Sequence, residues 1–137
     1  MYRYHSRVVG SAKGDVVAKL SMGELESRVM DVLWNSDDWL TPGDVHAVLK
    51  RRRPISYTTV MTVLVRLWKK DRLDRRRNGR AFEYHPVATR EESGAQRMRE
   101  ILASAGDRSV ALNQFLQSLS PGDRARVRRI LDQRGRR

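Results

Sequence analysis

The chain has 137 residues, 39% of them hydrophobic, and a formal net charge of +12, which suits one small domain with a helical appendage. It contains no cysteine, so disulfides, cysteine nucleophiles and thiolate metal sites are excluded. No apolar run approaches the roughly 20 residues of a membrane span, and no apolar leader opens the chain. We therefore expect a cytoplasmic protein without membrane insertion.

The positive charge is concentrated in one stretch. Residues 50–80 hold twelve Lys/Arg side chains and only two acids, so they carry +10 of the total. A protein that is merely basic and soluble would spread its excess charge, whereas a face that binds a polyanion concentrates it. The pattern indicates a nucleic acid as the partner.

Two helices are expected before this basic stretch. Residues 1–19 show no sustained periodicity, and we interpret them as a flexible N-terminal extension. The first helix should run over residues 22–35, with Ser21 as its cap. The second should begin at Thr41, which can cap it ahead of a first-turn proline.

A third helix is predicted from Ser56, its cap, to Lys70. The spacing i, i+3, i+4, i+7 assigns one face to the core: Val60, Val63, Leu64 and Leu67. The opposite face carries short hydroxyls and methyls, which suit base edges and the thymine methyl. An ordinary solvated surface is the alternative, but threonine is a mediocre helix former. The predicted base-reading residues are Tyr57, Thr58, Thr59, Met61 and Thr62.

A basic hairpin follows, with strands over residues 73–77 and 80–87. Asn78-Gly79 between them is a strong turn signal, in which both residues must accept positive φ. Arginines here can lie along a DNA backbone, although one or two can instead pair with Asp74 or Glu83. The predicted phosphate contacts are Arg51, Arg52, Arg66, Lys69, Arg75, Arg76, Arg77 and Arg80.

The chain ends in three short helical segments. About fifty residues of this kind bury little core alone, and a second copy of the chain is the economical partner. Three helices and a two-stranded wing are the order of a winged helix-turn-helix. We therefore expect a mainly α fold with the winged helix at 20–87 and a helical dimerisation region at 88–137. The residues assigned to dimerisation are Met98, Leu102, Leu112, Phe115, Leu116, Leu119, Val127, Ile130 and Leu131.

The sequence predicts no enzyme. No paired carboxylates, nucleophile triad or phosphate loop stands out, so no catalytic residue and no cofactor are assigned. His5, His46 and His85 are far apart in sequence and lack carboxylates at ligand spacing, so no metal site is assigned either.

Four segments of the chain carry a family likeness: GELESRVMDVLW (23–34), SYTTVMTVLVRLWKKDRL (56–73), RAFEYHPV (80–87) and ALNQFLQSLSPGDRARVRRIL (111–131). Through them the chain resembles the penicillinase-repressor family of bacterial transcriptional repressors, the BlaI/MecI type. The third-helix run is the most specific part of the likeness.

The resemblance implies a homodimer that binds a palindromic operator in double-stranded DNA and blocks transcription. Carried onto this chain, the recognition positions are Thr58, Thr59, Met61 and Thr62. The resemblance also implies a membrane sensor-protease upstream and cleavage in the dimerisation region. The family's Asn-Phe cleavage pair is replaced here by Asn113-Gln114-Phe115.

Two other functions are compatible with parts of the sequence. The arginine clusters alone favour a non-specific nucleic-acid-binding or nucleoid-associated protein. A protein-interaction module that has kept a degenerate winged helix is a weaker alternative. A packaging protein would protect no inverted repeat, and an interaction module would not retain DNA at physiological salt.

Overall fold

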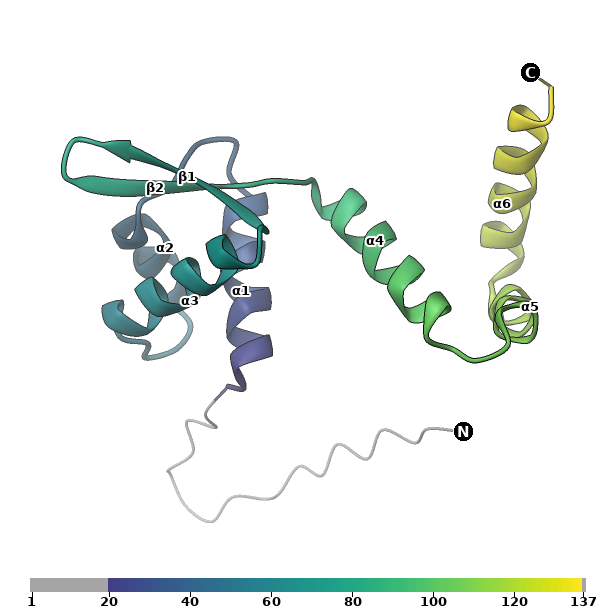
Figure 1. Cartoon of the computed structure of the whole chain (residues 1–137), viewed down its shortest axis with the longest axis horizontal. Coiled ribbons are helices and arrows are strands. Elements are labelled where there is room, and N and C mark those ends of the chain that lie inside the picture. Colours follow the sequence, from purple (N-terminus) through teal and green to yellow (C-terminus); the bar gives the residue numbers. More distant parts are fainter. Residues whose placement is uncertain (1–19, 137) are drawn as a thin grey trace, which may run out of the picture. The chain divides into compact units, whose positions relative to one another are not determined.

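The computed structural model describes residues 20–136, which form six helices and one two-stranded sheet (Figure 1). The chain divides into two compact units, the first ending at Thr89 and the second beginning at Arg90. The expectations for residues 1–19 and for His5 concern residues outside the described range. None of the described helices is long and apolar enough to cross a membrane.

Side-chain caps start the first two helices where the sequence predicts them. α1 spans Met22–Trp34, and the Ser21 hydroxyl accepts a hydrogen bond from the Glu24 N–H at 3.2 Å. α2 spans Pro42–Leu49 and begins with a reciprocal capping box between Thr41 and Asp44. Each cap satisfies backbone donors that a helix start leaves without an intrahelical partner.

α3 spans Tyr57–Lys69 and is held by its apolar face. Ser56 caps it by accepting the Thr59 N–H at 3.1 Å. The four residues predicted for its inner face are all fully buried, which confirms that prediction. They join a core shared with α1, α2 and the hairpin: Val29, Met30, Leu33, Val45, Val60, Val63, Leu64, Leu67, Leu73 and Tyr84.

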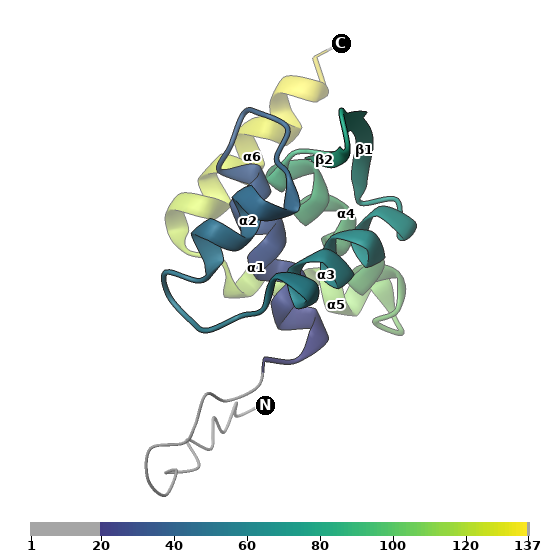
Figure 2. The ribbon, with the colours of Figure 1, turned by 90° about the vertical axis from the view of Figure 1, so that its left-hand side faces the viewer.

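α3 ends in a tight reversal that leads into the hairpin (Figures 1 and 2). Asp71 adopts a left-handed conformation with φ 59°, and it is the only non-glycine residue with positive φ among residues 20–136. The Arg72 N–H then donates to the Leu67 carbonyl, and the Asp71 N–H to the Trp68 carbonyl, each at 3.0 Å. These two bonds form a Schellman-type C-terminus that turns the chain directly into the first strand.

The hairpin pairs β1 (Leu73–Asn78) with β2 (Ala81–Pro86) in antiparallel register. The predicted turn was wrong by one residue: Asn78 pairs with Ala81, so Gly79 and Arg80 are the two turn residues. Of the two predicted turn positions, only Gly79 has positive φ, at 64°, as in a type II′ turn. Asn78 stays in the ladder because its side-chain amide donates to the Glu83 carboxylate.

A third segment extends the hairpin on its other edge. Leu40 exchanges two backbone hydrogen bonds with Tyr84, at 3.0 and 2.8 Å. This bridge ties the segment between α1 and α2 to β2, and it was not predicted from the sequence.

The second unit contains α4 (Arg90–Ala103), α5 (Arg108–Ser118) and α6 (Pro121–Arg134). Asp107 and Ser120 cap the last two helices by accepting backbone N–H groups three residues ahead. None of the described residues of this unit is buried. Its helices therefore expose most of their apolar side chains within a single chain.

Candidate nucleic-acid interface

The outer face of α3 presents hydroxyl and methyl groups. Tyr57, Thr58, Met61 and Thr62 are all exposed, because the inner face of the same helix is committed to the core. Tyr57 keeps 46% of its surface accessible while its ring meets the His46 ring edge-on, with centroids 5.9 Å apart. Four of the five predicted base-reading residues therefore lie on one accessible surface.

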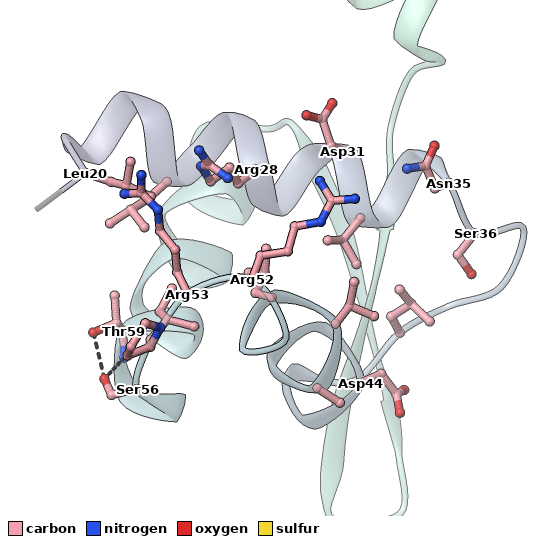
Figure 3. A pocket seen from close by; sticks show the side chains of 18 residues that line it. Leu20, Arg28, Asp31, Asn35, Ser36, Asp44, Arg52, Arg53, Ser56 and Thr59 are labelled. Carbon is pink, nitrogen blue, oxygen red and sulfur yellow. Dashed lines mark hydrogen bonds between the residues drawn. The ribbon is translucent and has the colours of Figure 1, made fainter. Parts of the chain in front are cut away.

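Thr59 lies apart from these four. Its hydroxyl is bonded to the Ser56 hydroxyl at 2.7 Å, which engages it in the start of the helix (Figure 3). The side chain lines a groove of about 870 Å³ between α1, α2 and the beginning of α3. Arg52 and Arg53 extend from the connection after α2 toward α1 along the same groove (Figure 3).

The Thr62 hydroxyl has a defined polarity. It donates its proton to the Thr58 carbonyl one turn earlier, at 3.0 Å. The oxygen keeps lone pairs that can accept a hydrogen bond, and the methyl group remains available for apolar contact. In a major groove these two groups suit a base amino group and a thymine methyl respectively.

Val65 is a member of this face that the sequence analysis missed. It is half-buried and follows Met61 and Thr62 at i+4 and i+3, so it continues the row that ends at Lys69. The helical spacing alone places Val65 on the outer face. Because valine is apolar and lies inside a hydrophobic run, its residue type suggested the core instead.

Arg75 fastens the hairpin to α3. Its guanidinium carbon lies 3.6 Å from the centroid of the Trp68 ring and 4.1 Å from that of Phe82. A guanidinium placed against two aromatic rings gains cation–π attraction and covers apolar surface. This half-buried arginine therefore has a structural role within the unit.

Arg76 is engaged on the opposite face of the hairpin. Its guanidinium donates to the carboxylate of Glu83, its cross-strand neighbour, at 3.1 Å. Glu83 is only 6% exposed. The guanidinium carbon of Arg76 also lies 4.5 Å from the Trp39 ring centroid. This pairing is one of the two that the sequence allows for the hairpin arginines.

Arg77 and Arg80 lie close to the tip of the hairpin. Arg80 occupies the turn itself, and both side chains are exposed. Arg51 and Lys69 are exposed as well, after α2 and at the end of α3. The eight predicted phosphate contacts therefore occupy structurally different positions, and these four are exposed and in no ion pair among residues 20–136.

Arg66 is held by a carboxylate on another helix. Glu26 of α1 lies 3.6 Å from the Arg66 Nε and 2.7 Å from the Lys70 Nζ. Burial alone raises the pKa of the Glu26 carboxyl, but Lys70 and Arg66 outweigh it, so the pKa lies below its ordinary value. Glu26 is therefore ionised at neutral pH.

Glu26 is not among the site residues predicted from the sequence. A signal for it exists, because Glu26 precedes Val29, Met30 and Leu33 at the spacing of the buried stripe. An acid at the first position of an apolar stripe requires a cationic partner when the helix is buried. The packing of α1 against α3 determines which cation becomes this partner.

The two roles of the hairpin arginines predict different effects on stability. Arg76→Ala removes a partner of the buried Glu83 carboxylate and should lower the free energy of unfolding by about 1–2 kcal/mol. Arg80→Ala, in the exposed turn, should change it by less than about 0.5 kcal/mol. Urea unfolding followed by tryptophan fluorescence measures this, since all three tryptophans lie in the first unit. Equal midpoints for both variants would contradict the assignment.

The chain matches known proteins over most of its length. A family model described as penicillinase repressor matches residues 22–133. Two relatives named transcriptional regulator BlaI, from Mycobacterium tuberculosis strains CDC 1551 / Oshkosh and ATCC 25618 / H37Rv, are each 42% identical over 119 residues. Each match covers 84% of this chain and 86% of the relative.

Two solved structures are also similar to this chain. One is the DNA-binding domain of the repressor BlaI, with 28% identity and a TM-score of 0.46, covering 58% of this chain and 93% of that one. The other is Bacillus licheniformis BlaI in monomeric form with the blaP half-operator, at 28% identity and a TM-score of 0.44. This match covers 56% of this chain and 90% of that one.

The family match extends through both compact units, and the first unit folds as three helices with a two-stranded wing. The chain belongs to the penicillinase repressor family of DNA-binding transcriptional regulators.

Proposed function

We propose that this regulator is a sequence-specific repressor that binds a palindromic operator in double-stranded DNA as a homodimer. The observation that carries the proposal is the outer face of α3, where Thr58, Met61 and Thr62 are exposed over a fully buried inner face. A helix fixed in this way presents its side chains to a major groove at a set rotation.

Affinity and sequence preference come from different groups. Exposed cations at the end of α3 and at the hairpin tip, Lys69, Arg77 and Arg80, approach backbone phosphates and fix the register. Thr58 and Thr62 contact base edges that lie between these phosphates. Non-specific packaging of DNA, the alternative function, requires only the cations and leaves the threonine face without a role.

Two substitutions at Thr62 separate its hydroxyl from its methyl group. Thr62→Val keeps a methyl and removes the oxygen, whereas Thr62→Ser keeps the oxygen and removes the methyl. If the oxygen accepts from a base amino group, Thr62→Val should lose about 1–3 kcal/mol of discrimination at one base pair of each half-site. Thr62→Ser should retain it.

The measurement is competitive binding of a duplex that the wild-type chain selects from a random pool, together with its single-base variants. Both substitutions should leave the affinity for random duplex unchanged, since phosphate contacts carry that part of binding. Unaltered base preference in both variants would contradict the assignment of Thr62. Failure of the wild-type chain to enrich any inverted repeat would favour the packaging function instead.

Dimerisation is proposed for the second unit. Among the predicted residues, Met98, Leu112, Phe115, Ile130 and Leu131 are exposed by 44–65% within one chain. The remaining predicted residues, Leu102, Leu116, Leu119 and Val127, are half-buried. Ile101 and Val110, which the sequence analysis did not include, are 60% and 52% exposed. Exposed apolar side chains at this density mark a surface that a partner covers.

A charge placed on this surface should separate the two copies. Phe115→Glu puts a carboxylate at an apolar contact and should weaken self-association by at least about 100-fold. Gln114→Glu adds the same charge at the neighbouring exposed polar position and serves as the matched control. Sedimentation equilibrium of the full chain measures both, and a dimer that persists unchanged in Phe115→Glu would place the interface elsewhere.

Regulation by proteolysis, which the family resemblance implies, remains a proposal for this chain. Asn113, Gln114 and Phe115 lie inside α5 and are exposed, and the Gln117 amide donates to the Asn113 side chain at 3.0 Å. A protease needs extended backbone, so α5 must unwind before cleavage. A helix without fully buried side chains offers little resistance to such local opening. A membrane sensor-protease is the proposed upstream partner.

A further inference from the structure

Glu26 joins α1 to the last turn of α3 through two cations. The Lys70 Nζ lies 2.7 Å from its Oε1, and the Arg66 Nε lies 3.6 Å from the same oxygen. Lys69, between them in sequence, has no ion-pair partner among residues 20–136. On the basis of the proposed DNA binding by α3, we propose that Glu26 is a positioning residue that withholds Arg66 and Lys70 from DNA phosphates.

The carboxylate keeps these cations because it is the less solvated partner. The Glu26 side chain is 11% exposed, whereas those of Arg66 and Lys70 are 48% and 49% exposed. A buried carboxylate that loses its counter-cations is strongly penalised, while a half-exposed cation that changes partner is not. A phosphate that recruited Lys70 would therefore leave an uncompensated charge beneath α3, and the exchange yields little net free energy.

The arrangement lowers the sequence-independent part of DNA binding. Each phosphate neutralised by a cation contributes about −0.9 to the slope of log K against log salt concentration. Arg66 and Lys70 are held on the flank of α3 that faces α1, whereas Lys69 continues the outer face. Cations bound to Glu26 therefore add little to this slope, even though they belong to the most basic stretch of the sequence.

The experiment measures binding of the full chain to a random-sequence duplex by fluorescence anisotropy over a series of salt concentrations. Glu26→Gln releases both cations and should steepen the slope by about 0.9 for each phosphate gained. This corresponds to about 8-fold tighter binding per phosphate at 0.1 M salt. Glu24→Gln, an exposed acid two residues earlier on α1, changes the net charge equally and should leave the slope unaltered.

A second pair of variants avoids the buried position. Lys69→Gln should make the slope shallower by about 0.9, whereas Lys70→Gln should leave it nearly unchanged. An equal loss of slope in both variants would show that Lys70 reaches a phosphate despite Glu26, and this result can be obtained even if Glu26→Gln fails to fold. A gain of slope in Glu26→Gln separates a carboxylate that withholds cations from an ion pair that only stabilises the fold.

The proposal about Glu26 is overturned if Lys70→Gln loses as much slope as Lys69→Gln, or if a folded Glu26→Gln variant binds like the wild type. These outcomes differ from a failure of the proposed function. If the proposed DNA binding were wrong, the wild-type chain itself would not bind the duplex, or its binding would show no salt dependence.

Discussion

Burial of the inner face of α3 is the constraint on which the rest of the structure depends. Val60, Val63, Leu64 and Leu67 are completely inaccessible, and full burial of such a side chain contributes about 1.5–3 kcal/mol. Rotation of α3 about its axis would expose several of them at once, so the helix has one favoured orientation. The core therefore fixes the direction in which the outer row from Thr58 to Lys69 points. A helix that contacts base edges needs such a fixed rotation.

The fold gives the cations of the basic stretch different roles. Arg75 and Arg76 hold the hairpin against Trp68 and Trp39, and Arg76 also pairs with Glu83 across the two strands. Arg66 and Lys70 share the Glu26 carboxylate. The exposed cations outside these ion pairs include Arg51, Lys69 and Arg80. Net charge along a sequence therefore overstates the charge that reaches DNA, because the arginines that shape the site also neutralise its buried acids.

Local sequence signals predicted much of the fold. Contacts between residues distant in sequence could not be predicted from such signals. Helix caps and apolar spacing depend on neighbours within one or two turns, and they predicted the starts of α1, α2 and α3 and the inner face of α3. The turn was misplaced by one residue because the Asn78 amide is engaged by Glu83 across the strands. The Leu40–Tyr84 bridge and the Glu26–Lys70 pair each join residues more than forty positions apart, and no local pattern specifies such a pair.

The central claim is that the outer face of α3 and the hairpin tip together form the DNA-binding surface. Backbone amide chemical shifts of the full chain, measured by NMR before and after addition of a selected duplex, test it directly. The account predicts the largest changes at Thr58, Thr62, Lys69 and Arg80, with small changes along the groove between α1 and α2. Changes centred on that groove or on α4–α6 would contradict it.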